Sequence, residues 1–396
     1  MSLSSFKREV QRTWNLLRDR SEDVLVIHHD DADGICSGAI IYEALKRKGF
    51  KAKLICIEKL YPEIIEKLHL NGGKTIFYCD IGSPHCDKIS EFNKGRNLTV
   101  VLDHHDPSPS RDPMVIDLNL ENFGYKGESD FSGSTCCYLF VKTVDDKMYD
   151  LSYLALTGSI EIPEGYKSLN LEVLKEALSK GVVKYEGNKL IALKHNFILQ
   201  DLFKSLQVLG SVGYYQGGPK MGVELCLHGE KPHIVKFVKE LEEKRKRANK
   251  RMLSELYRGG LSKGRYIQWF YAKNFFKGMG TKVVGTFCSY LSYQRRLIDP
   301  SKYLIGYMDV PREIPGLGEL KSDYVKISVR VPELLRKEVE GGRYPSAVKL
   351  LMEAVKGLGF ADGHAFAASG VALKSHALEV INKMDDIVEQ YVMNKR

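Results

Sequence analysis

The sequence of 396 residues lacks the long apolar runs of a membrane protein and the N-terminal pattern of a secreted one. No apolar run approaches about 18 residues, so we predict no membrane-spanning helix. The first residues, MSLSSFKREVQRTWNLL, form an amphipathic pattern without the apolar centre of a signal peptide. We therefore expect a cytoplasmic protein without a membrane partner.

The sequence also lacks cysteine pairs and repeats. Its eight cysteines are scattered, and no two of them form a CxxC pair. Several lie in apolar stretches, which indicates reduced and mostly buried thiols and argues against a disulfide framework or a zinc site. There is no internal repeat and no low-complexity segment. What remains is a globular protein long enough for two or three domains.

What the chain does have is an excess of positive charge. Lys and Arg number 59 against 50 Asp and Glu, which gives a formal net charge of +9. An excess of this sign favours a polyanionic partner such as nucleic acid.

The first part of the chain alternates strand-like and helix-like segments. We predict strands at 23–29, 53–58, 74–80, 98–105 and 114–119, and helices at 35–48, 61–70, 83–93, 132–144 and 150–160. Alternation at this spacing is typical of βαβ units and a parallel sheet. The continuous Val, Ile, Leu and Phe runs favour strands covered on both faces.

A more helical stretch follows at 168–260 and ends in a long amphipathic helix. Its apolar residues recur at three- and four-residue steps: Ile234, Val238, Leu241, Ala248, Met252 and Leu256. The same helix carries a basic segment: Lys244, Arg245, Lys246, Arg247, Lys250 and Arg251. This segment is either an ordinary solvated face or a connector that follows a phosphate backbone.

From about residue 262 the pattern becomes mixed. Strand-like segments lie at 265–273, 302–310 and 323–331, and helix-like segments at 281–293, 345–359 and 375–392. The expected fold class is therefore α/β, with a parallel-sheet N-terminal domain, a helical connector and a smaller mixed α/β C-terminal domain. We place the boundaries of the three parts at 1–165, 166–261 and 262–396.

Acidic and imidazole side chains follow three of the predicted strands: Asp31 and Asp33, then Asp80, then Asp103, His104 and His105. Because ligands bind outside the carboxyl ends of parallel strands, these groups should converge. Such ligands suit Mn²⁺, Fe²⁺ or Mg²⁺ better than a structural zinc. Asp80 can bridge two ions, with Asp31 on one of them. Asp33 and His104 would hold the other, an arrangement that supports displacement at phosphorus.

Each motif alone has an ordinary explanation. A DxD pair is common in turns and calcium loops, and a lone Asp80 can cap a helix. Three motifs at three strand ends of one βαβ run favour the metal site.

The segments HHDDADGICSG, YCDIGS and VLDHHDPS resemble the first three motifs of the DHH phosphoesterase superfamily. KISVRV (326–331) and GFADGHAFAASG (359–370) resemble the DHH-associated C-terminal domain. The resemblance covers roughly 22–165 and 262–392. Within the superfamily the chain looks most like archaeal RecJ-like single-strand nucleases, including those that bind the GINS replication complex.

The resemblance implies a role for each matching residue. It implies two divalent cations, Mn²⁺ or alternatively Mg²⁺, and it implies GINS-type replication proteins as partners. Asp103 would orient the site, and His105 would contact the scissile phosphate. The implied metal ligands are His29, Asp31, Asp33, Asp80 and His104, and the implied substrate contacts are Ser328, Arg330, Gly363 and His364.

Two departures stand out. Where the family's fourth motif supplies an Asp, this chain reads LALTGSIEIPEGY, with Ile162 at the expected position and Glu161 beside it as the candidate replacement ligand. In the C-terminal motif, Asp362 stands where the first Gly of GGH is usual, and Ser369 splits the AAG.

The leading hypothesis is a metal-dependent phosphodiesterase, an exonuclease on single-stranded DNA or RNA. One alternative is a hydrolase of short oligoribonucleotides or nucleotide phosphates. Another is a non-catalytic replisome subunit with a degenerate metal site, which the missing Asp favours and the other intact motif residues oppose.

Overall fold

The structure is a computed structural model that describes residues 2–20, 23–127, 129–163 and 165–394. The chain forms two compact units, Met1–Leu241 with Pro315–Leu317, and Glu242–Ile314 with Gly318–Arg396. The three-part division at residues 165 and 261 remains a prediction.

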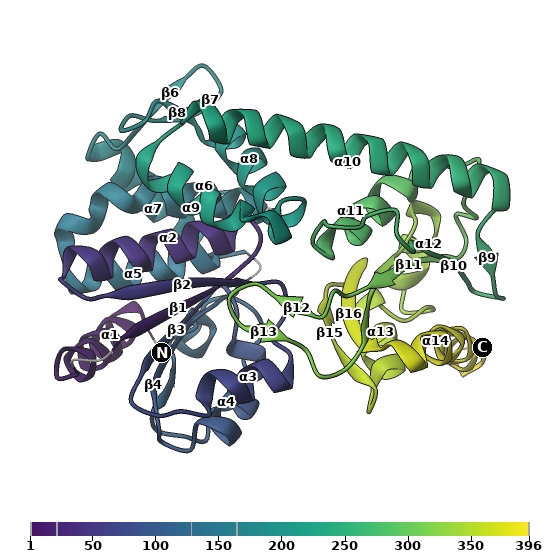
Figure 1. The fold of residues 1–396 in the computed structure, drawn as a ribbon, viewed down its shortest axis with the longest axis horizontal. Helices are drawn as coiled ribbons and strands as arrows, with labels where there is room; N and C mark the ends of the chain where they lie inside the picture. The colour runs from purple at the N-terminus through teal and green to yellow at the C-terminus, as the bar shows by residue number, and fades with distance from the viewer. Residues whose placement is uncertain (1, 21–22, 128, 164, 395–396) are drawn as a thin grey trace. The chain divides into compact units, whose positions relative to one another are not determined.

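A five-stranded parallel sheet forms the centre of the first unit (Figure 1). Its strands run in the order β2-β1-β3-β4-β5. Strand β2 therefore lies on one side of β1, and β3, β4 and β5 follow on the other side. Every residue of β3 and β4 is buried, as predicted for strands covered on both faces. The strands are β1 (Val24–His29), β2 (Ala52–Ile57), β3 (Thr75–Cys79), β4 (Leu98–Leu102) and β5 (Val115–Asp117).

Helices cover both faces of this sheet, with α3 and α4 on one side and α2 and α5 on the other (Figure 1). Two glycines let α2 approach β1 closely. A Cβ at Gly34 would lie 2.5 Å from the His29 backbone, and one at Gly38 would lie 2.7 Å from the His28 ring. The helices up to the end of the predicted N-terminal part are α1 (Leu3–Arg18), α2 (Ala32–Arg47), α3 (Pro62–His69), α4 (Cys86–Asn93), α5 (Gly133–Val144) and α6 (Ser152–Gly158).

The stretch after α6 is helical, as expected, but it also contains a small antiparallel sheet that the sequence analysis missed. Its strands are β6 (Val183–Glu186), β7 (Lys189–Ala192) and β8 (Phe197–Ile198). They are too short to show a clear period of two. The helices here are α7 (Ser168–Ser179), α8 (Leu199–Ser211), α9 (Gly218–His228) and α10 (Pro232–Gly259).

Helix α10 is the predicted amphipathic helix. Ile234, Leu241, Ala248, Met252 and Leu256 are buried, and Val238 is half-buried. The basic segment is divided: Lys244 and Arg245 are half-buried, and the other four residues are exposed. The helical pattern is therefore confirmed, while both interpretations of the charges stay open.

The second unit has a mixed six-stranded sheet in the order β15-β16-β14-β11-β10-β9. Strands β10 and β11 are parallel, and the other neighbours are antiparallel. A separate short hairpin is formed by β12 (Glu313–Ile314) and β13 (Gly318–Glu319). The six strands are β9 (Ser262–Lys263), β10 (Ile267–Tyr271), β11 (Tyr303–Asp309), β14 (Tyr324–Arg330), β15 (Gly359–Gly363) and β16 (Ala367–Leu373).

Helix α11 covers one face of this sheet, where a Cβ at Gly306 would meet the Cys288 sulfur at 2.5 Å. The opposite face carries the apolar core, which includes Ile305, Ile327 and Leu351. The remaining helices are α11 (Lys282–Leu291), α12 (Glu333–Glu340), α13 (Ala347–Val355) and α14 (Ala377–Met393). The two-part α/β fold class is therefore confirmed.

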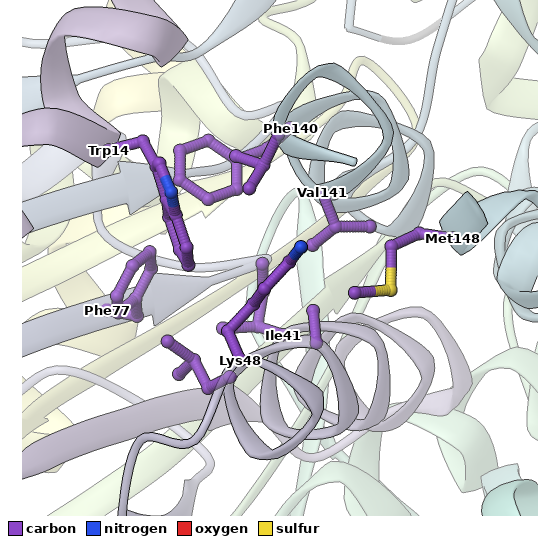
Figure 2. A pocket seen from close by; sticks show the side chains of 10 residues that line it. Trp14, Ile41, Lys48, Phe77, Phe140, Val141 and Met148 are labelled. Carbon is purple, nitrogen blue, oxygen red and sulfur yellow. The ribbon is translucent and has the colours of Figure 1, made fainter. Parts of the chain in front are cut away.

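A narrow apolar cavity lies beneath α1 (Figure 2). Trp14, Phe77, Phe140 and Met148 are among the residues that line it. A water-sized sphere can occupy only about 10 Å³ of it, which is too small for a ligand.

Seven of the eight cysteines are buried, as predicted. Among the described residues, no helix combines the length and apolar character needed to cross a bilayer.

Candidate metal centre

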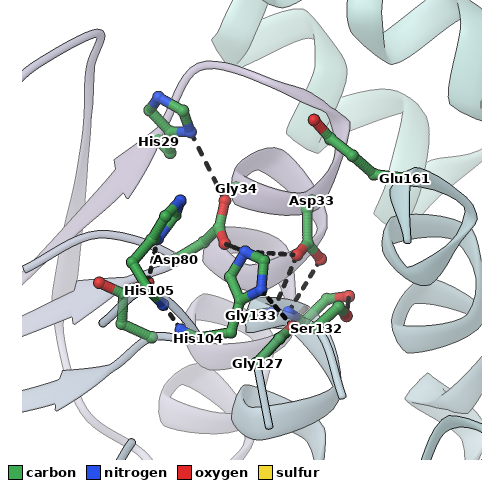
Figure 3. Close-up of polar contacts among 12 residues, drawn as sticks. His29, Asp33, Gly34, Asp80, His104, His105, Gly127, Ser132, Gly133 and Glu161 are labelled. Carbon is green, nitrogen blue, oxygen red and sulfur yellow. Dashed lines mark hydrogen bonds and ion pairs between the residues drawn. The ribbon is translucent and has the colours of Figure 1, made fainter. Parts of the chain in front are cut away.

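The three predicted motifs meet at the carboxyl ends of β1, β3 and β4, which are neighbours in the sheet. This edge includes the point between β1 and β3 where the strand order reverses, the usual ligand site of open parallel sheets. Figure 3 shows the side chains gathered there around Asp80. Asp80 belongs to two groups of donor atoms that can each hold a cation: with His29 and Asp31, and with His104 and His105.

The carboxylate of Asp80 lies between two imidazoles. Its Oδ1 is 3.4 Å from Nε2 of His104, and its Oδ2 is 3.6 Å from Nδ1 of His29. The residue has a positive φ of 59°, a left-handed conformation that Asp tolerates better than most residues and that is found at functional sites. Its N–H still donates to the Leu102 carbonyl at 2.8 Å. The backbone therefore stays paired with β4 while the side chain turns toward the site.

Glycine at position 133 makes room for this carboxylate. A Cβ on Gly133 would lie 2.2 Å from Asp80 Oδ1. That oxygen is buried and accepts no well-aligned hydrogen bond from the described residues. Burial, and after it the charges of Asp33 and Asp31, raise the pKa of Asp80 well above its ordinary value. A buried oxygen among like charges fits a divalent cation.

Asp31 has both a structural and a ligand-like oxygen. Its Oδ1 accepts from the Gly34 N–H at 2.9 Å and caps α2. Its Oδ2 lies 2.8 Å from Nδ1 of His29. The other ring nitrogen of His29 is 3.2 Å from Asp30 Oδ1. Asp30 is only 1% exposed, so this residue, which the sequence analysis did not select, is part of the site.

Asp33 differs from the other carboxylates because the start of α5 occupies both its oxygens. The N–H of Gly133 donates to Oδ2 at 2.8 Å, and the N–H of Ser134 donates to Oδ1 at 2.9 Å. Asp33 Oδ2 lies 4.0 Å from Nε2 of His104, near the site but outside both groups of donor atoms. The positive end of a helix therefore stabilises this carboxylate.

A buried cluster of hydroxyls fixes the start of α5. Ser132 caps the helix by accepting from the Thr135 N–H at 3.2 Å. Its Oγ lies 3.1 Å from that of Ser159. Thr135 and Ser159 both donate to Asn170 Oδ1 of α7, at 2.7 and 3.1 Å. Asn170, outside the predicted N-terminal part, thus supports the helix end that holds Asp33.

The two histidines after β4 are oriented differently. Nδ1 of His104 donates to the Gly127 carbonyl at 2.9 Å, which directs Nε2 toward Asp80. A neutral imidazole held in this way presents its other nitrogen as a metal ligand. Burial lowers the pKa of His104 and favours this neutral form. Nδ1 of His105 pairs with Asp103 Oδ1 at 2.7 Å, and the His105 side chain is 40% exposed.

Asp103 is fully buried and well supported by donors. The backbone N–H groups of Ser83 and His104 donate to it at 2.9 and 2.7 Å. Burial opposes its charge, but His105, His104 and the Ser83 N–H outweigh burial, and the pKa of Asp103 falls well below its ordinary value. Asp103 is therefore a buried anion that orients His105.

Two further polar residues near Asp103, Asp117 and Asn119, were not predicted from the sequence. Asp117 Oδ1, at the end of β5, accepts from Ser83 Oγ at 2.9 Å. Burial raises the pKa of Asp117 to about 6. Asn119 Nδ2 donates to the His105 carbonyl at 2.7 Å. The signal was present, since Asp117 is an acidic residue at a fourth parallel strand end.

The fourth-motif region lacks a buried carboxylate among its described residues. Ile162, at the expected Asp position, is 5% exposed, whereas Glu161 is exposed. Glu161 Oε2 accepts from Gln207 Nε2 at 3.3 Å. Its charge still contributes to the raised pKa of Asp80, although less than the other three carboxylates. The role of Glu161 as a ligand remains a prediction.

The predicted substrate residues of the second unit lie around β14 and β15. Ser328 is 1% exposed, beneath Gly285 of α11, where an added Cβ would lie 3.0 Å from its Oγ. Arg330 donates to Ser289 Oγ at 2.8 Å and to the Gly285 carbonyl at 3.0 Å. Gly363 and His364 are exposed, and Gly363 has a φ of 136°.

The unexpected Asp362 belongs to a polar row across this sheet. Lys326 Nζ donates to Ser369 Oγ at 3.0 Å, and Ser369 Oγ donates to Asp362 Oδ1 at 3.2 Å. Asp362 and Ser369, the two unusual residues of the C-terminal motif, therefore bond to each other.

Comparison with known proteins places part of the chain in a family. Residues 23–158 match the family described as "DHH family, N-terminal domain". A stretch of 143 residues is 34% identical to the uncharacterized protein MJ0831 of Methanocaldococcus jannaschii and covers 35% of this chain and 32% of that protein. The matched part thus spans about a third of the relative's length.

Solved structures share the fold over almost the whole chain. RecJ of Thermus thermophilus in complex with Mn²⁺ has a TM-score of 0.66 at 16% identity, covering 98% of this chain and 55% of that one. A second manganese-bound exonuclease RecJ has a TM-score of 0.65 at 15% identity, covering 98% and 94%. CDC45 from Entamoeba histolytica has a TM-score of 0.54 at 10% identity, covering 98% and 99%.

At these identities the structural matches establish the fold, and the family match covers the segment that carries all three strand-end motifs. Residues 23–158 therefore match the DHH family's N-terminal domain, and the chain has a RecJ-like fold.

Proposed function

We propose that the protein is a metal-dependent phosphoesterase that hydrolyses single-stranded nucleic acid as an exonuclease. The observation that carries the proposal is the position of Asp80, whose buried carboxylate is common to two groups of donor atoms at the carboxyl edge of the sheet. The family match and the RecJ-like fold support the phosphoesterase class.

Two divalent cations would be held on either side of Asp80. His29 and Asp31 form the first group with it, and His104 and His105 form the second. Such ions supply Lewis acidity at phosphorus and lower the pKa of water. The presence of Mn²⁺ in the RecJ structures favours manganese, with magnesium as the alternative.

The remaining residues position the substrate and the ligands. Asp103 holds Nδ1 of His105, so the outer edge of this half-exposed ring is directed toward an incoming phosphate. The N–H groups of α5 fix Asp33, which places a negative charge at a constant position 4.0 Å from His104.

The charge of the chain favours a polymeric substrate. The net charge is +9, and α10 presents exposed basic residues such as Lys246 and Arg247. Screened attraction to many phosphates strengthens with strand length. The alternative, a hydrolase of short oligonucleotides or nucleotide phosphates, uses the same metal centre.

A specific observation also favours a non-catalytic role. Ile162 replaces the fourth-motif carboxylate, and Asp33 is committed to the α5 backbone. The likeness to CDC45 is compatible with such a role. GINS-type partners remain a prediction from the family resemblance.

Digestion of end-labelled single-stranded DNA and RNA with and without Mn²⁺ tests the proposal. We expect metal-dependent shortening of a strand of about 20 nucleotides, and an Asp80→Asn variant that folds normally but has lost this activity. Cleavage of dinucleotides alone would select the short-substrate alternative. If no substrate is cleaved with any divalent metal, the non-catalytic role is the correct one.

A further inference from the structure

The outward face of α11 and the turn that follows it carry two exposed tyrosines. Positions 282, 286 and 290 recur at four-residue steps and so share one face of α11, and Tyr293 lies in the turn directly after the helix. Tyr290 is 46% exposed and Tyr293 is 68% exposed, the latter being the largest value among the exposed large apolar and aromatic residues described. Both rings are therefore accessible to a ligand.

The base of this face is rigid. The ring of buried Phe287 lies 6.1 Å from that of Tyr290. The N–H of Tyr293 donates to the Tyr290 carbonyl at 3.3 Å, so a tight turn joins the two residues. Rings on a fixed backbone lose little entropy when they bind a flat ligand.

The sheet-facing side of α11 contacts a cationic side chain. Arg330 bonds to Ser289 and Gly285, one turn of α11 apart, and so lies directly beneath the helix. Register pairs Ser328 with Ser369, which places the Lys326–Ser369 hydrogen bond on this sheet too. Ser328 and Arg330 therefore lie beneath α11, while the tyrosines lie on its outward side and in the turn that follows it.

In the sequence around the tyrosines, all charged residues are positive. From residue 282 to 298 the sequence contains Lys282, Arg295 and Arg296 but no Asp or Glu. Both arginines are exposed, and Arg295 also pairs with Glu333 at 3.1 Å. Aromatic rings among cations form the usual binding surface for unpaired bases, since each base has a flat face and a phosphate.

We propose that Tyr290 and Tyr293 form a stacking platform for the bases of single-stranded nucleic acid. The proposal rests on the proposed function, because it assigns the strand that the metal centre would cleave to a surface on the second unit. Stacking does not depend on base identity, so the platform would hold strands of any sequence.

Binding to fluorescent oligothymidylate in EDTA, measured by anisotropy, tests the platform without cleavage. The test variant is Tyr290→Ala with Tyr293→Ala, and the matched control is Tyr185→Ala, a tyrosine of β6 with a similar exposure of 52%. We expect the test variant to bind roughly tenfold more weakly or worse and the control to bind like the wild type. A strand with abasic sites should show no difference between wild type and the test variant.

The outcomes separate this inference from the proposed function. Equal binding by wild type and the test variant would overturn the platform while Mn²⁺-dependent cleavage stands. An equal loss on normal and abasic strands would also overturn it, because the effect would not come from bases. Mn²⁺-dependent dinucleotide cleavage by the wild type, measured in parallel, reports on the metal centre and so on the proposed function.

Discussion

The two motif-bearing regions of this chain treat their polar groups in opposite ways. At the edge of the first sheet, Asp80 is buried among like charges, and one of its oxygens accepts no well-aligned hydrogen bond from the described residues. On the second sheet, Arg330 donates to α11 and Asp362 accepts from Ser369. The first arrangement leaves a buried, charged oxygen without a hydrogen bond, whereas in the second the charged groups of Arg330 and Asp362 are hydrogen-bonded within the protein.

This difference indicates where the ligand contributes to stability. A site with uncompensated buried charge gains free energy when a metal binds, because binding to the folded state alone stabilises it. A satisfied network gains little and must exchange existing hydrogen bonds for new ones. We therefore expect the first region to respond to metal and the second to respond to mutation.

The largest effect should come from Gly133→Ala, which changes no charge. Its Cβ would lie 2.2 Å from Asp80 Oδ1 and would displace the carboxylate. We expect Mn²⁺ affinity, measured by calorimetry, to fall about 100-fold or more, since ångström-scale displacements have effects of this size. Gly259→Ala is the control, because nothing lies within 4 Å of the added Cβ. Unchanged Mn²⁺ affinity in Gly133→Ala would contradict the tight fit around Asp80.

Arg330→Ala should have a smaller effect, and this effect should be on the free energy of unfolding and not on Mn²⁺ affinity. It removes the hydrogen bonds to Ser289 and Gly285 that attach α11 to β14. We expect the free energy of unfolding to fall by about 2–3 kcal/mol in urea titrations, as is usual when charged hydrogen bonds are lost. Mn²⁺ affinity should stay unchanged. A variant as stable as the wild type would show that these bonds contribute nothing, and the comparison between the two regions would fail.

The smallest effect concerns Asp117 and pH. Its pKa of about 6 exceeds the ordinary 3.8, so the folded state binds a proton more tightly than the unfolded chain does. The resulting stabilisation is present at low pH and is lost as the pH rises through 6. Relative to Asp117→Asn, the wild type should lose about 1–2 kcal/mol between about pH 4 and pH 7, allowing for partial exposure. Urea titrations in EDTA measure this, and parallel pH curves would contradict it.

Sequence patterns that extend over whole strands and helices made much of this fold predictable. Apolar runs and strand-end carboxylates located β1, β3 and β4 because a parallel sheet brings its carboxyl ends together. The β6–β8 sheet was not predictable, since strands of two to four residues show no period. The hydrogen bonds from α5 to Asp33 could not be predicted either, because they join residues 100 and 101 positions apart. The role of Asp30 depends on its burial, and the sequence alone does not show whether a charged residue is buried.

The hydroxyl cluster around Asn170 has a consequence for how this chain can be divided. Thr135 and Ser159 donate to an amide that belongs to α7, so the helix that holds Asp33 is completed by a residue beyond the predicted boundary at 165. A fragment that ends before α7 would leave these hydroxyls without their acceptor. The motif-bearing segment and α7 therefore belong to one compact unit, and a designed fragment that keeps the predicted metal ligands would have to keep Asn170 as well.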